Sequence, residues 1–164
     1  MSNLTKGSIG NPLLAGILGG FISAMVKSGT EDIMPPRLPN VTPQPIQMLE
    51  AVGIHANNLT YTYSEQVINW GGNGIHILFS IITAIFYCFA VRFNKIFSVF
   101  FGIPFGLVFA FGAHGVVLPM IGIGSNVFFG PIDGLISEFL GAILWIWTIE
   151  CVRCYFEPQN LARN

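Results

Sequence analysis

Residues 69–92 read NWGGNGIHILFSIITAIFYCFAVR, and this stretch decides the fold. Its section 74–91 carries no formal charge and would be about 27 Å long as a helix, close to the thickness of the hydrocarbon core of a bilayer. At 100° per residue, one face is polar or small: Asn69, Gly72, His76, Ser80, Thr83, Tyr87 and Ala90. The opposite face is apolar: Leu78, Phe79, Ile81, Ile82, Ile85, Phe86 and Phe89. The pattern predicts a membrane helix with a protein-facing side and a lipid-facing side.

The composition of the whole chain supports a membrane protein. Of the 164 residues, 52% are hydrophobic and only 9% are charged, whereas a soluble domain is about one quarter charged. The net charge of −1 argues against a nucleic-acid-binding surface, which needs many basic residues. We therefore expect one membrane domain, residues 1–164, whose partner is the lipid bilayer.

The apolar runs predict an all-α, polytopic membrane protein with four transmembrane helices, at about residues 9–27, 69–91, 96–122 and 134–152. Pro104 should kink the third helix and Pro119 should end it. Between the first two helices, residues 28–68 hold five of the ten prolines and are too polar to cross a bilayer. Within this segment we expect a short surface helix at 46–54 and an extended piece at 60–64.

Small residues mark two faces for close helix packing. Gly16 and Gly20 form a G-x-x-x-G pair in the first helix, and Gly102 and Gly106 form another in the third. Such pairs let helix backbones approach each other, either inside one chain or between the subunits of a homo-oligomer.

Basic residues predict the orientation. If four helices alternate, one side of the membrane receives Lys6, Arg92, Lys95, Arg153 and Arg163, and the other receives only Lys27 and Arg37. The positive-inside rule then places both termini in the cytoplasm and the proline-rich segment outside. Near the inner interface we expect a Glu150–Arg153 pair, and an aromatic belt formed by Trp145 and Trp147.

This topology brings four ionisable side chains, one from each helix, to the outer leaflet: Lys27, His76, His114 and Glu138. Charged groups at such depth are costly unless they are paired or hydrated, so the cluster is a candidate site. Three interpretations remain open: pairing that only holds helices together, proton sensing or conduction, and a metal site made of two histidines and a glutamate.

No motif in the sequence indicates an enzyme. The chain has no nucleophile elbow, Walker loop, dinucleotide fingerprint or H-E-x-x-H, so we assign no catalytic residue. Cys151 and Cys154 form one C-x-x-C without a second pair or an adjacent histidine, which favours packing cysteines over a metal or redox centre. We expect no cofactor and no resident metal.

Four pieces of the sequence resemble the YagU-like family of bacterial inner-membrane proteins. They are ISAMVKSGTE with PPRLP, NWGGNGIHILFSI followed by YC, AHGVVLPMIGI, and SEFLGAILWIWTIECVR. The resemblance implies a compact helical domain in the bacterial inner membrane and a link to acid tolerance. The resemblance also implies that the following residues of this chain occupy the family's signature positions: Lys27, Glu31, Pro35, Pro36, Arg37, Asn69, Trp70, His76, His114, Pro119, Glu138 and Glu150.

The signature positions suggest one coupled polar network at the outer leaflet, because the two prolines could fold Arg37 back over the bundle. Its expected members are Lys27, Glu31, Arg37, His76, His114 and Glu138. Glu138→Gln should then disturb folding or function far more than Glu157→Gln. We expect a conduit for protons or small ions, or a pH-responsive protein linked to acid tolerance. The alternative is a structural or accessory membrane protein. A conduit would need a path along Ser80, Thr83 and Tyr87, and an oligomer to form it.

Overall fold

The computed structural model describes residues 10–38, 41–124 and 126–156. Four stretches are long and apolar enough to cross a membrane: Asn11–Ile33, Trp70–Phe93, Lys95–Met120 and Ile132–Phe156. The predicted all-α membrane fold with four spans is therefore confirmed. The elements are α1 (Gly10–Ile33), α2 (Gln44–Ala51), η1 (Ala56–Asn58), β1 (Thr60–Tyr63), β2 (Gln66–Asn69), α3 (Trp70–Phe93), η2 (Lys95–Gly102), α4 (Ile103–Gly112), η3 (Ala113–Val117), α5 (Leu118–Met120), η4 (Val127–Phe129) and α6 (Ile132–Phe156).

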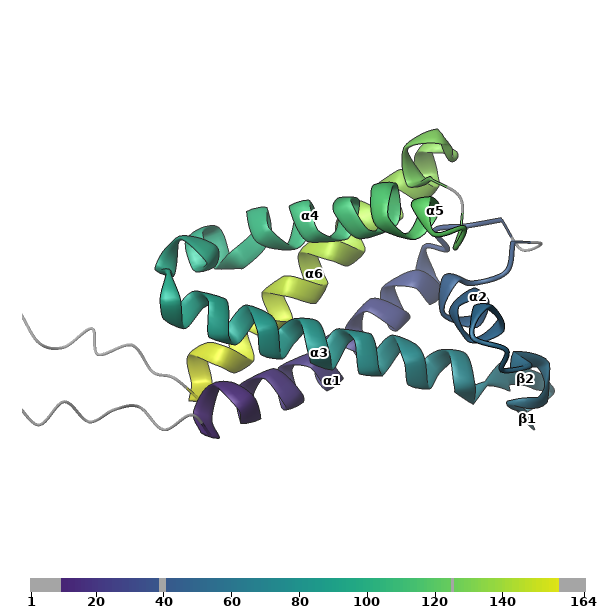
Figure 1. Cartoon of the computed structure of the whole chain (residues 1–164), viewed down its shortest axis with the longest axis horizontal. Helices are drawn as coiled ribbons and strands as arrows, with labels where there is room; N and C mark the ends of the chain where they lie inside the picture. The colour runs from purple at the N-terminus through teal and green to yellow at the C-terminus, as the bar shows by residue number, and fades with distance from the viewer. Residues whose placement is uncertain (1–9, 39–40, 125, 157–164) are drawn as a thin grey trace, which may run out of the picture.

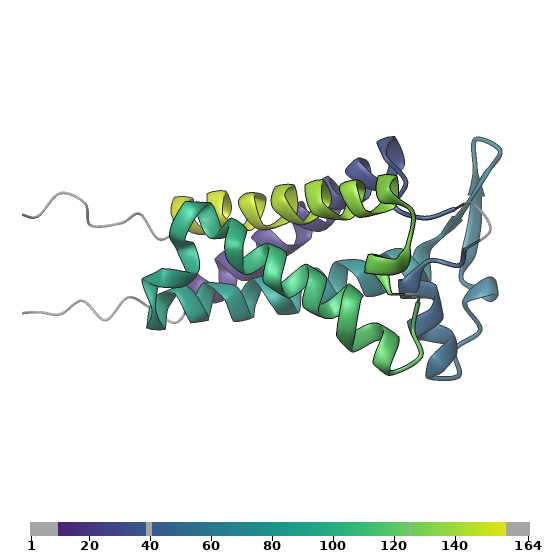
Figure 2. The ribbon, with the colours of Figure 1, turned by 90° about the horizontal axis from the view of Figure 1, so that it is seen from above.

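Helix α1 is the centre of the bundle. It packs along both α3 and α6, whereas α4 packs mainly on α6, so the third span is the least buried of the four. The start of α1 and the end of α6 lie at one end of the bundle, and α2, β1 and β2 lie at the other, which we call the capped end (Figures 1 and 2). The buried core consists of Ala15, Ala84, Tyr87, Cys88, Val91, Trp145, Ile146 and Ile149.

Two glycines of α1 bring it close to α3. A Cβ atom on Gly16 would lie 2.6 Å from the Cα of Ile85, and one on Gly20 would overlap the backbone of Ile81. Ile81 and Ile85 are half-buried, so the prediction that both face lipid is wrong. The glycines remove the side chains that would otherwise hold the two backbones apart.

The second glycine pair lies where η2 and α4 meet α3 and α6. A Cβ atom on Gly102 would meet the hydroxyl of Tyr87, and one on Gly106 would lie 2.5 Å from a methyl carbon of Ile146. Both pairs of glycines thus have close neighbours within the chain itself.

The third span is interrupted, and the interruption differs from the one expected. Phe100, Phe101 and Gly102 have φ angles of +49°, +56° and +74°, which separate η2 from α4. Pro104 follows in the first turn of α4, where a helix needs no N–H donor. The predicted kink at Pro104 is therefore wrong, because the chain turns before this proline.

Pro119 lies at the end of the third span, as predicted. It lies inside α5, and the span ends at Met120. Proline has no N–H to offer to the carbonyl four residues before it, which here is that of Gly115. The side-chain amide of Asn126 donates to this carbonyl at 2.7 Å instead. The turn before Pro119 is a π-helix, η3, which contains His114.

At the capped end, the bounds of the helices differ from those predicted. Helix α1 continues to Ile33, beyond the predicted end at residue 27, and α2 covers 44–51 rather than 46–54. Strands β1 and β2 form an antiparallel hairpin. Asn69 then starts α3, because its side-chain oxygen accepts from the Gly72 N–H at 2.8 Å. The predicted helix start at residue 9, and the residues Lys6, Glu157 and Arg163, lie outside the described residues.

Candidate functional site

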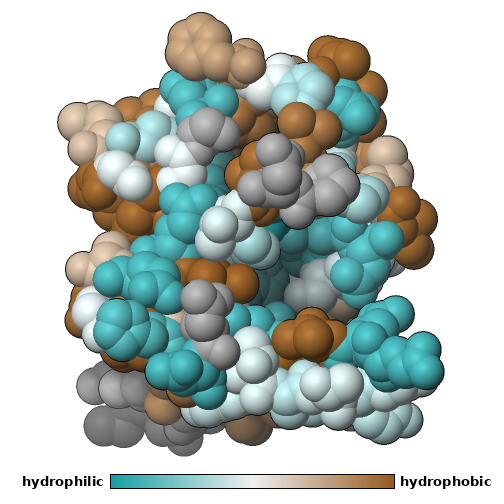
Figure 3. All heavy atoms as spheres, turned by 90° about the vertical axis from the view of Figure 1, so that its right-hand side faces the viewer, coloured by the Kyte–Doolittle hydropathy of each residue, from teal (hydrophilic) through white to brown (hydrophobic). Residues whose placement is uncertain are grey.

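A cavity of about 810 Å³ lies at the capped end of the bundle. Residues of α1, α2, β2, α3 and α6, together with those of the third span, line it. Figure 3 views the molecule from this end and shows a hollow surrounded by hydrophilic side chains. All six residues that we expected in the polar network are among the lining residues.

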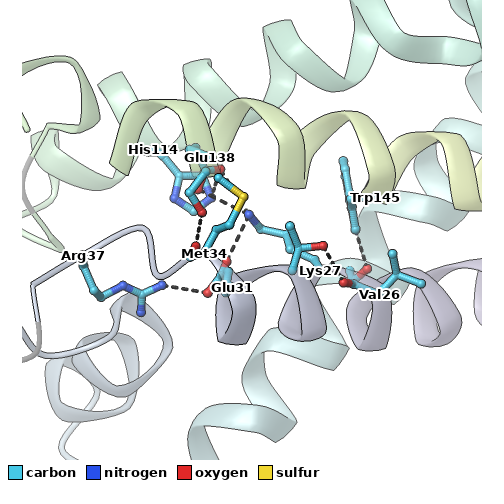
Figure 4. Close-up of polar contacts among 11 residues, drawn as sticks. Val26, Lys27, Glu31, Met34, Arg37, His114, Glu138 and Trp145 are labelled. Atoms are coloured by element: carbon cyan, nitrogen blue, oxygen red, sulfur yellow. Dashed lines mark hydrogen bonds and ion pairs between the residues drawn. The ribbon is translucent and has the colours of Figure 1, made fainter. Parts of the chain in front are cut away.

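Five of these six residues form a chain of charged contacts. The Lys27 ammonium lies 3.3 Å from both carboxylate oxygens of Glu138 and 3.1 Å from Glu31. Arg37 donates to the other oxygen of Glu31 at 2.9 Å. His114 lies with its Nε2 atom 3.7 Å from Glu138. Figure 4 shows Lys27 reaching from α1 toward both carboxylates.

The sequence explains how Lys27 can be buried, with only 7% of its surface exposed. Glu31 follows Lys27 by one helical turn, so both lie on the same face of α1. Gly141 of α6 leaves room for the lysine: a Cβ atom there would lie 3.3 Å from its Nζ atom. Glu138 lies one turn earlier on α6 and supplies the opposite charge that a buried lysine requires.

The segment after α1 is held against α6. Ser137 donates a hydrogen bond to the carbonyl of Met34, and Gly134 lets the Pro36 carbonyl approach closely. This positions Arg37 beside Glu31, whereas the two prolines suggested a position above Glu138.

His76 lies at the cavity but does not share the glutamate. Within the described ranges, no hydrogen bond or ion pair joins His76 to Glu138, and its Nε2 atom is buried without a partner. Nor do three His, Cys, Asp or Glu side chains come together in a metal-binding arrangement in these ranges. The alternative of a metal site made of two histidines and a glutamate therefore does not fit the geometry.

The bottom of the cavity is closed by a hydrogen-bonded group that the sequence analysis did not identify. Trp145 donates its indole N–H to the Ser80 hydroxyl at 2.7 Å, and Ser80 bonds in turn to the Gly20 carbonyl and to Ser23. Trp145 is 5% exposed, so its assignment to an interfacial belt is wrong. The lining ends at this group. Beyond it, Thr83 of the predicted ion path donates to its own helix.

A second buried polar cluster lies at the opposite end of the bundle. Arg153 and Glu150 form a bidentate ion pair with two contacts of 2.7 Å, and Tyr87 donates to the same carboxylate at 2.8 Å. Arg153 is 0% and Glu150 3% exposed, so the expectation of an interfacial, shallow pair is wrong. A signal was available in the sequence, since Arg153 lies on the stripe of α6 that contains the buried residues Ala142, Trp145 and Ile149.

The Lys27–Glu138 contact gives a direct prediction. Glu138→Gln should lower the free energy of unfolding by about 2 kcal/mol, because Lys27 stays buried and loses one of its two carboxylate partners. Glu65→Gln, in the exposed hairpin turn, is the matched control and should change stability by less than about 0.5 kcal/mol. It replaces Glu157→Gln, which lies outside the described residues. Denaturant unfolding in detergent measures both, and equal losses would contradict the assignment.

Fold and site together define a multi-pass membrane protein that buries ionic groups between its spans. The chain belongs to the family described as Protein of unknown function (DUF1440), which matches residues 21–151. That range includes all six residues expected at the cavity.

One curated relative is a protein of the bacterial inner membrane. The chain is similar to the inner membrane protein YagU of Escherichia coli (strain K12), with 28% identity over 164 residues, covering 84% of this chain and 80% of the relative. The predicted YagU-like family is thereby confirmed, and the likeness together with the four apolar spans supports a multi-pass inner-membrane protein. No solved structure matches the chain.

Proposed function

We propose that this protein is a pH-responsive inner-membrane protein, linked to acid tolerance, whose sensing site is the cavity at the capped end. In this proposal both termini are cytoplasmic and the cavity opens to the outside. The distribution of basic residues supports this orientation. Arg92, Lys95 and Arg153 lie at the uncapped end, whereas Lys27 and Arg37 lie at the capped end, in line with the positive-inside rule.

One observation carries the proposal: Glu138 is shared between Lys27 and His114. Imidazole is the side chain that most readily exchanges a proton near physiological pH. A proton on His114 places a second positive charge 3.7 Å from Glu138, where it competes with Lys27. The other charged or titratable groups that line the cavity come from α1, the following segment and α3: Glu31, Asp32, Arg37 and His76.

The closed bottom of the cavity favours sensing over conduction by a single chain. The lining ends at Ser80 and Trp145, whose polar atoms already have protein partners. Conduction would require a homo-oligomer with a path between subunits. The alternative of a structural protein rests on the same ion pair. In that case the only role of Lys27 and Glu138 is to hold α1 against α6.

The fluorescence of Trp145 provides the test, since its ring lines the cavity. We would replace Trp70 and Trp147 by phenylalanine, reconstitute the protein in liposomes, and lower the external pH from about 7.5 to about 5, the range in which histidine changes charge. The emission should change reversibly. His114→Asn should remove at least about half of the change, and His55→Asn, at an exposed histidine of the cap, should leave it intact.

Each alternative predicts a different result. A response that survives His114→Asn unchanged would contradict the sensing role of His114. A structural protein would show no response at all. A dye enclosed in the same liposomes reports acidification of the interior: a flux that depends on the protein would indicate conduction instead.

A further inference from the structure

The permanent charges around the cavity do not balance. Lys27 and Arg37 are the cations of the lining, and Glu31, Asp32 and Glu138 are its carboxylates. Asp32 lies exposed at the edge, and its carboxylate forms no ion pair or side-chain hydrogen bond within residues 10–38, 41–124 and 126–156. With neutral histidines the lining therefore carries a net negative charge, which attracts a cation.

The inner wall of the cavity is aromatic. The rings of Phe79 and Phe109 have centroids 6.0 Å apart, and those of Phe109 and Trp145 are stacked at 5.9 Å. All three residues line the cavity. Aromatic faces attract organic cations and bury apolar groups, so this wall suits a ligand with an apolar body.

His76 supplies an unused polar atom. Its Nε2 is buried without a hydrogen-bond partner, and the residue lies in the same lining as the aromatic wall. A ligand can supply the missing hydrogen bond once the imidazole turns toward the cavity, because the Nε2 atom itself has almost no accessible surface. In the neutral ring it can accept from a ligand N–H, depending on the tautomer.

We propose that the cavity binds an organic amine: a protonated amino group on an apolar or aromatic body. The amino group lies near Asp32, His76 and the two carboxylates that form ion pairs, those of Glu31 and Glu138. The apolar body lies against Phe79, Phe109 and Trp145. A volume of about 810 Å³ is within the range of small-molecule sites. A soluble amine and the ammonium head group of phosphatidylethanolamine share this chemistry. The inference goes beyond the pH response and does not depend on it.

Three ligands of similar size test the charge preference: phenethylamine as the cation, 2-phenylethanol as the neutral compound and 3-phenylpropionate as the anion. The full chain, in nanodiscs of phosphatidylglycerol, is titrated with each at neutral pH by calorimetry. Quenching of Trp145 in the protein with Trp70 and Trp147 replaced by phenylalanine locates the ligand. Phenethylamine should bind at least tenfold more tightly than either of the others and should quench Trp145.

Matched variants assign the binding to this cavity. Asp32→Asn should weaken phenethylamine binding about two- to fivefold, the effect of losing one solvent-exposed ion pair. Glu65→Gln removes the same charge outside the cavity and should leave the affinity unchanged. His76→Leu should weaken binding further than His76→Gln, which keeps an oxygen acceptor.

The source of the amine is identified by adding phosphatidylethanolamine to the nanodiscs. Competition with phenethylamine would make the lipid head group the ligand, and lack of competition would indicate a soluble amine. Both results support an amine site. Equal affinities for the three ligands, a preference for the anion, or an affinity unaffected by Asp32→Asn would overturn the proposal. His114→Asn distinguishes the two proposals, because it should remove at least about half of the pH response and retain amine binding.

Discussion

Gly20→Ala is expected to lower the free energy of unfolding by about 3 kcal/mol, the upper range for overpacking a core. The added methyl group would overlap the backbone of Ile81 in α3, and a backbone cannot move aside as a flexible side chain can. Helices α1 and α3 would have to separate, which also pulls Ser80 away from the Gly20 carbonyl. Denaturant unfolding in detergent, followed by circular dichroism, measures the loss.

Gly29→Ala is the matched control because it makes the same change in the same helix. A Cβ atom on Gly29 has no neighbour within 4 Å, and alanine stabilises a helix relative to glycine by up to about 1 kcal/mol. Gly29→Ala should therefore be neutral or stabilising. Similar losses for the two variants would show that α1 and α3 do not pack through Gly20.

Arg153→Met is expected to cost about 3–5 kcal/mol, the usual effect of leaving a buried charge without its partner. Glu150 would keep the Tyr87 hydroxyl as a donor at 2.8 Å and the weakly donating Cys154 thiol at 3.5 Å. The same unfolding assay measures this loss. Lys95→Met removes an exposed cation near the same end of the bundle and should change stability by less than about 0.5 kcal/mol.

The double variant Glu150→Leu/Arg153→Met tests the cause of that loss. Because it removes both charges, it should be more stable than Arg153→Met alone, although the Tyr87 hydroxyl then loses its acceptor. If the double variant were the less stable of the two, an unpaired carboxylate would not explain the effect of the single substitution.

The polar face of α3 could be predicted from periodicity. Ser80, Thr83 and Tyr87 are buried, as the 3.6-residue spacing indicated. The same spacing misplaced Ile81 and Ile85, because Gly16 and Gly20 let α1 approach over a wider arc of α3 than the polar stripe covers. The crossing of two helices determines which large residues lie against a glycine of the neighbouring helix. The periodicity of a single helix does not contain this information.

The third span shows how hydrogen bonding between distant residues escapes sequence reasoning. Proline positions suggested a kink and a stop. The break instead occurs at Phe100 and Phe101, which adopt left-handed backbone angles that residue type does not predict. The hydrogen bond of Asn126 to the Gly115 carbonyl, which compensates for Pro119, joins residues on either side of a turn.

The residues that line the candidate site could be predicted from the sequence, but not all of the contacts between them. Lys27 and Glu138 could be placed at one depth by counting residues, and the structure joins them directly. His76 lines the cavity without bonding to Glu138, since the rotation of α3 is fixed by its contacts with α1. The Glu150–Arg153 pair was placed too near the surface, because a charged pair close to a helix end is usually interfacial.

The central claim is that the cavity opens to the outside of the cell, and labelling of introduced cysteines tests it most directly. The three native cysteines are replaced by alanine, and Asn73→Cys in the cavity lining is compared with Lys95→Cys at the uncapped end. A membrane-impermeant thiol reagent added to intact spheroplasts should label the Asn73→Cys protein and should reach the Lys95→Cys protein only after permeabilisation. Labelling of the Lys95→Cys protein alone in intact spheroplasts would place the cavity on the cytoplasmic side and contradict the account.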